Sequence, residues 1–74
     1  MNLQPCRDLE VIVTMLEVGA LCLTDQPGVT FTKDALFAEA RAVAGVALDE
    51  RDLEIVLSGL RSIRRKPGGA LCLS

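Results

Sequence analysis

The sequence contains no histidine, tryptophan or tyrosine, and its only aromatic residues are Phe31 and Phe37. Without histidine or tyrosine, acid–base chemistry would depend on carboxylates, lysine or cysteine. The carboxylates lie where helices are expected to begin, and capping accounts for them there. The segment KPGGA at 66–70 lacks the spacing of a phosphate-binding loop, and no dinucleotide fingerprint is present. The sequence therefore predicts a protein that is not an enzyme and uses no cofactor.

Cysteine is also scarce, with Cys6, Cys22 and Cys72 far apart along the chain. An odd number of widely spaced cysteines is not a disulfide framework, and no Cys/His cluster offers a zinc site. We expect small, buried or half-buried thiols in a reducing cytoplasm, with Cys6 the most exposed of the three.

The N-terminus lacks the charged and then apolar segments of a signal peptide. The apolar run at 9–23 is interrupted by Glu10 and Glu17 and is too short to span a bilayer. These features predict a soluble, cytoplasmic protein without membrane contact.

The chain has 74 residues, of which 50% are hydrophobic, and a formal net charge of −2. This length allows one domain, 1–74, which is near the smallest size at which a single hydrophobic core can stabilise a fold. The hydrophobic content excludes intrinsic disorder. Because phosphate contacts need cations, the slightly acidic balance means that any nucleic-acid binding must rest on a local basic patch.

The first predicted helix, about 8–22, is apolar on two sides. One stripe has helical spacing and is expected to face the core: Leu9, Ile12, Val13, Leu16, Ala20 and Leu23. A second stripe, on nearly the opposite side, consists of Val11, Met15, Val18 and Cys22. A chain this small has little protein to cover both sides, so we predict a homodimer contact at the second stripe. The alternative is a helix fully enclosed in the core. Since Gly19 costs a helix about 1 kcal/mol relative to alanine, an extended ending from Ala20 also stays open.

The middle of the chain predicts a turn, a minor strand and a second helix. Pro27-Gly28 suits a type II turn, and the residues at 29–31 are β-prone. Thr32 is expected to cap a helix at about 33–44, which stops near Gly45. The buried residues predicted for this helix are Leu36, Ala40 and Val43, with Ala44 at the edge.

The third predicted helix, about 49–63, is expected to begin at Asp49, with Leu48 packing on Leu53 as a hydrophobic staple. Its predicted buried face consists of Leu53, Val56, Leu57, Leu60 and Ile63. Asp49 and Asp52 together could suggest a metal site, but an N-cap followed by a first-turn acid is the ordinary interpretation. A hairpin is predicted at about 62–73 with its turn at 66–69, so that Ala70 and Cys72 face one way and Leu71 and Leu73 the other.

This order of elements resembles the winged helix-turn-helix family over about 7–73. The resemblance rests on the end of the third helix, the glycine turn and the apolar return strand: Leu57, Leu60, Ile63, Gly68, Gly69, Leu71 and Leu73. It implies an α+β, mainly helical fold in which three helices precede a C-terminal β-hairpin, the wing.

In that family the third helix enters the DNA major groove and the wing contacts phosphate or the minor groove. The contact residues implied here are Arg51, Glu54, Ser58, Arg61, Arg64, Arg65 and Lys66. Two features depart from the pattern. The junction AVAGVALDERD is longer than the tight turn of the basic motif, and the entering segment DERDLE is acidic and repels phosphate.

Two functions therefore stay open. The first is a small DNA-associated transcriptional regulator that contacts phosphate through Arg61, Arg64, Arg65 and Lys66. The second is an acidic protein–protein interaction module that uses the winged-helix scaffold and presents the mixed-charge third helix or the apolar first helix to a partner. The alternative for the basic patch itself is a solvated hairpin whose cations lie favourably near a helix C-terminus.

Overall fold

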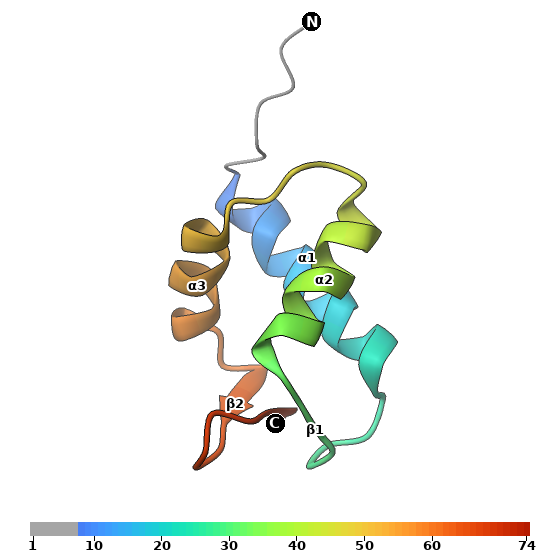
Figure 1. Ribbon diagram of the computed structural model, residues 1–74, viewed down its shortest axis with the longest axis vertical. Coiled ribbons are helices and arrows are strands. Elements are labelled where there is room, and N and C mark those ends of the chain that lie inside the picture. Colours follow the sequence, from blue (N-terminus) through green and yellow to red (C-terminus); the bar gives the residue numbers. More distant parts are fainter. Residues whose placement is uncertain (1–7) are drawn as a thin grey trace, which may run out of the picture.

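The computed structural model describes residues 8–74, which form three helices and a small antiparallel sheet (Figure 1). The elements follow in the order α1 (Leu9–Leu23), β1 (Thr30–Phe31), α2 (Lys33–Ala44), α3 (Glu50–Gly59), β2 (Ile63–Arg65) and β3 (Leu71–Leu73). The predicted α+β, mainly helical class is confirmed. The prediction for Cys6 lies outside the described residues.

Side chains at the helix starts satisfy the backbone N–H groups that have no partner within the helix. Thr32 accepts a hydrogen bond from the backbone N–H of Ala35 at 3.1 Å, and Asp49 accepts one from that of Arg51 at 2.8 Å. Both predicted caps are confirmed. Asp8 caps α1 in the same way, so that helix begins at Leu9. At the other end of α2, Gly45 adopts a left-handed conformation with φ 67°, as its predicted stop position requires.

The helices α1 and α2 cross at Gly19. A Cβ atom added to Gly19 would lie 3.0 Å from the backbone N of Ala40 and 3.2 Å from its Cα. Glycine therefore allows an approach that a side chain would obstruct, and this packing compensates for its low helix propensity. The helix continues through it to Leu23, which excludes the extended ending from Ala20.

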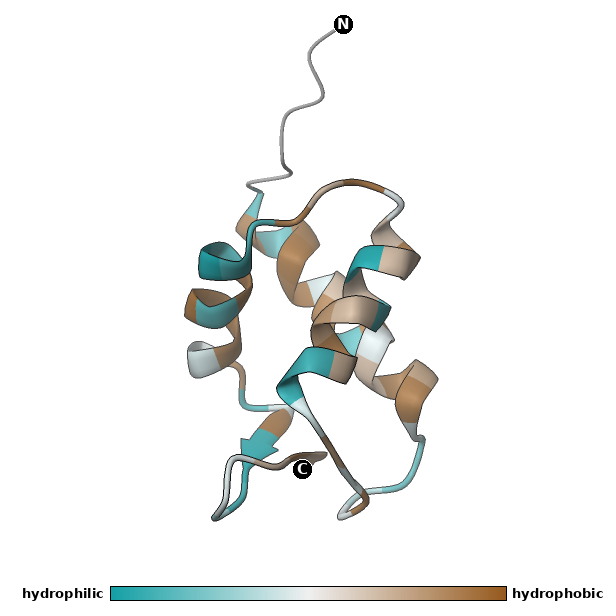
Figure 2. Ribbon diagram, in the orientation of Figure 1, coloured by the Kyte–Doolittle hydropathy of each residue, from teal (hydrophilic) through white to brown (hydrophobic). Residues whose placement is uncertain are grey.

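The core lies between the helices and the inner face of the sheet, where brown apolar segments meet in Figure 2. Its buried members are Ile12, Leu16, Ala20, Leu36, Phe37, Ala40, Leu48, Leu53, Val56, Leu57, Ile63 and Leu71. The predicted staple residues Leu48 and Leu53 both belong to it.

Two predicted core residues are instead exposed. Val43 is 39% exposed, and Phe37 takes its place in the core at 1%. Val43 lies about 100° around the helix from Ala44, which packs against the core in line with Phe37 and Ala40. Leu9, in the first turn of α1, is 56% exposed, and the buried stripe of this helix begins at Ile12.

The third helix ends at Gly59, four residues earlier than predicted. Leu60 has extended backbone angles, and Ile63 begins β2 opposite Leu73. A helix continued through Ile63 would remove this strand pairing. Leu60 and Ile63 still contact the core, so the apolar spacing was correct and the secondary structure assigned to it was wrong.

The sheet has the order β1-β3-β2, and both pairs are antiparallel. The C-terminal strand β3 is therefore central: Leu71 pairs with Phe31 on one side and with Arg65 on the other. At the hairpin turn, the N–H of Lys66 donates to the carbonyl of Ala70 at 2.8 Å. Cys72 is buried as expected, whereas Cys22 is exposed on α1, so the expectation of a buried or half-buried thiol is wrong for Cys22.

Candidate nucleic-acid interface

The charged side chains that follow Glu54 in the sequence are all positive. No aspartate or glutamate follows Glu54 in the sequence. Four exposed cations lie in this segment, one in the connection after α3 and three in β2 and the hairpin turn: Arg61, Arg64, Arg65 and Lys66. All ten acidic residues precede this segment, so a basic hairpin projects from an acidic helical body.

Strand β2 distributes these cations over two faces of the hairpin. Arg64 pairs with Cys72 and Arg65 pairs with Leu71. Consecutive strand residues point to opposite faces, so Arg65 lies on the face of the buried Leu71 and Arg64 on the other. The basic patch predicted as one surface is therefore divided along the strand.

The exposed face of α3 holds the remaining predicted contact residues, Arg51, Glu54 and Ser58. The Ser58 hydroxyl donates to the carbonyl of Ile55 at 2.8 Å. Ile55 itself is 58% exposed on this helix, and the sequence analysis missed it. The signal was present, because Ile55 lies outside the buried stripe of the third helix.

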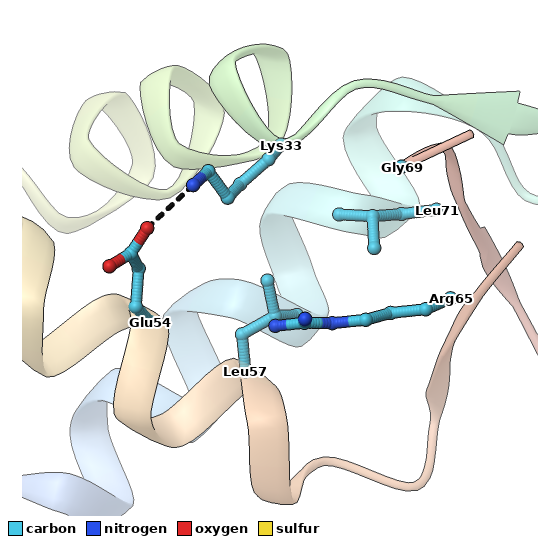
Figure 3. Close-up of a pocket in the computed structure, with 6 residues that line it drawn as sticks. All are labelled: Lys33, Glu54, Leu57, Arg65, Gly69 and Leu71. Atoms are coloured by element: carbon cyan, nitrogen blue, oxygen red, sulfur yellow. Dashed lines mark hydrogen bonds and ion pairs between the residues drawn. The ribbon is translucent and has the colours of Figure 1, made fainter. Parts of the chain in front are cut away.

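A cleft of about 390 Å³ separates α3 from the start of α2 and the hairpin (Figure 3). It is lined by Lys33, Glu54, Leu57, Arg65, Gly69 and Leu71. Leu57 and Leu71 are buried and belong to the core. Arg65 extends from the hairpin across the cleft toward Leu57.

Lys33 and Glu54 form an ion pair across the cleft, with Nζ and Oε1 2.5 Å apart. The hydrogen bond from Lys33, and then its charge, hold the pKa of Glu54 below its ordinary value, and Arg65 lowers it further. The same hydrogen bond raises the pKa of Lys33. The Lys33 Nζ also lies 5.9 Å from the centroid of the Phe37 ring, within cation–π range.

Lys33 is a residue of this cleft that was not predicted from the sequence. It stands 21 residues before Glu54, and the two side chains meet only because α2 and α3 both pack against α1. No local pattern in the sequence signals this contact.

The second apolar stripe of α1 is open to solvent on this chain. Val11 is 37% and Val18 36% exposed, and Cys22 is exposed too. Met15 is half-buried and packs partly against the core. Leu21, at 55% exposure, is a further apolar residue on the uncovered side of the helix. Residues 8–74 by themselves therefore do not enclose α1.

Within residues 8–74, no three His, Cys, Asp or Glu side chains are grouped so that they could hold a metal ion. None of the helices in that range is both long and apolar enough to cross a membrane.

Comparison with known proteins finds no match to any family model, to any curated protein or to any solved structure.

Proposed function

We propose that this chain is a small, non-enzymatic, winged-helix-like protein that associates with DNA as a transcriptional regulator in the cytoplasm. The supporting observation is the basic hairpin, in which four exposed cations stand without any nearby carboxylate in sequence. Arginine and lysine side chains supply the sequence-independent affinity for phosphate that positions a protein on a duplex.

The third helix contributes less to DNA affinity than the hairpin. Its cap and first turn carry Asp49, Glu50 and Asp52, which stabilise the positive end of the helix dipole but repel phosphate. The helix therefore lies beside the duplex without deep insertion. Arg51 and Ser58 are its groups for polar contact, while the hairpin supplies most of the affinity.

A second candidate function, an interaction module for a protein partner, is favoured by Ile55. This side chain is 58% exposed on α3 and is surrounded in sequence by Arg51, Glu54 and Ser58. An exposed aliphatic residue with a polar surround resembles the centre of a small protein–protein contact. It has no evident use against phosphate.

We also propose a homodimer in which the stripe of Val11, Met15, Val18 and Cys22 contacts the same stripe of a second copy. The 4-3-4 spacing of these residues is that of a two-helix seam. A dimer would present two hairpins to one duplex. Light scattering at increasing protein concentration tests it, and a constant monomer mass would contradict it.

Fluorescence anisotropy with a labelled duplex at several salt concentrations tests the DNA proposal. We expect a Kd at or below the non-specific range of about 10⁻⁴ to 10⁻⁶ M at physiological salt, which weakens as salt rises. The double variant Arg64→Glu/Arg65→Glu should abolish binding while circular dichroism shows unchanged helicity. Among single charge reversals, Arg51→Glu on α3 is the matched control for Arg64→Glu in the hairpin and should cause the smaller loss.

Binding weaker than about 10⁻⁴ M by the unaltered protein would overturn the DNA proposal. Equal losses in the hairpin and α3 variants would contradict the dominant part given to the hairpin.

A further inference from the structure

The cleft between α2, α3 and the hairpin combines two kinds of surface. Its walls carry the charged ends of Lys33, Glu54 and Arg65, and its apolar side chains are Leu57 and Leu71 (Figure 3). A phosphodiester has the same two-part character, because a charged phosphate adjoins the apolar carbons of a sugar. At about 390 Å³, the cleft is much larger than a single side chain and opens beside the basic hairpin.

The one anion in this cleft is Glu54, among the six residues that line it. It accepts a hydrogen bond from Lys33 and also interacts with the charge of Arg65. A phosphate entering the cleft would need these same two cations. The carboxylate of Glu54 therefore takes the place beside Lys33 and Arg65 that a phosphate would otherwise take.

We propose that the cleft is the phosphodiester-binding site of the DNA interface and that Glu54 limits its affinity by competing with phosphate for Lys33 and Arg65. This proposal rests on the DNA association proposed above. It makes Glu54 a positioning residue that weakens binding. The resemblance to winged helices instead implied that Glu54 contacts the DNA or partner directly.

The test compares Glu54→Gln with Glu50→Gln by anisotropy titration of a labelled duplex over a range of salt concentrations. Both variants remove one negative charge from α3, but only the first lies in the cleft and releases Lys33. Glu54→Gln should bind several-fold more tightly at low salt. Its plot of log K against log salt should steepen by about 0.9, the value for one further phosphate contact. Glu50→Gln should raise affinity less and leave the slope unchanged.

The variant Lys33→Gln supplies the reciprocal measurement. In the Glu54→Gln background it should return the slope to that of the unaltered protein, because the released cation is gone. Circular dichroism checks that each variant keeps its helices.

The outcomes separate this proposal from the DNA proposal itself. Equal effects of Glu54→Gln and Glu50→Gln, with a loss in Arg64→Glu/Arg65→Glu, would overturn the competition by Glu54 and leave DNA association standing. Absence of binding by the unaltered protein and by every variant would overturn both.

Discussion

Two glycines, one in the helix pair and one in the hairpin, are required for different physical reasons. Gly19 has ordinary helical backbone angles, but an added Cβ atom would lie 3.0 Å from the backbone of Ala40. Gly68 has open space around it, but its φ of 88° is one that residues with a side chain rarely adopt. Position 19 thus requires glycine because of helix packing, and position 68 requires it because of backbone conformation.

The helix pair and the hairpin also differ in how much of their surface is buried. The helix pair buries Ile12, Leu16, Leu36 and Phe37 and tolerates little added volume. The hairpin has three-residue strands, and Arg64, Lys66 and Gly69 are exposed on it. Added volume in the helix pair should alter unfolding most, whereas charge changes at the exposed hairpin cations should alter the proposed DNA binding.

The largest effect on stability is expected from Gly19→Ala. The added methyl group crowds a backbone that cannot rotate away, and such overpacking costs about 1–3 kcal/mol. The gain in helix propensity, about 1 kcal/mol, offsets only part of it. Urea denaturation should therefore show a net loss of about 1 kcal/mol, which is large for a domain of this size.

Gly59→Ala is the matched control, since Gly59 lies in α3 with nothing within 4 Å of an added Cβ. It should be neutral or more stable by up to about 1 kcal/mol. Similar changes at both positions would show that the α1–α2 crossing is not limited by volume.

A smaller loss is expected from Gly68→Ala. An L-residue in this left-handed conformation costs about 1 kcal/mol, without any steric conflict with neighbouring atoms. Alanine also makes the unfolded chain less flexible, which offsets about half of this cost and leaves a net loss of about 0.5 kcal/mol. A synthetic chain with D-alanine at position 68 should keep the stability of the unaltered protein, because a D-residue favours positive φ. An equal loss with both enantiomers would mean that space at the hairpin tip, rather than backbone conformation, requires glycine.

The features that the sequence predicted correctly depend on neighbours in the chain. The caps at Thr32 and Asp49 form within a single turn, and the glycine stop at position 45 follows from the conformation of one residue. The end of α3 could not be predicted in this way. The run from Leu53 to Ile63 keeps helical spacing, yet Ile63 is required in the sheet by its pairing with Leu73.

The candidate site shows the same limit. The cations of the hairpin were visible as a cluster in sequence, but their division between two faces depends on the register of Arg64 opposite Cys72. The ion pair of Lys33 and Glu54 joins helices whose contact no local pattern encodes. Among the ion pairs of residues 8–74, this is the one that joins α2 to α3 across the cleft.

The smallest expected effect tests that connection through the titration of Glu54. The folded-state pKa lies below the ordinary glutamate value, first because of the Lys33 hydrogen bond and then because of its charge. Stability from this group should therefore be fully present above the ordinary pKa and be lost as the pH falls through the folded-state value.

Carboxyl ¹³C NMR should show Glu54 titrating at lower pH in the unaltered protein than in Lys33→Gln. Arg65→Gln should shift it less, because Arg65 contributes only a weaker charge interaction. Identical titration of Glu54 in all three proteins would mean that the ion pair does not persist in solution and that α2 is not tied to α3 across the cleft.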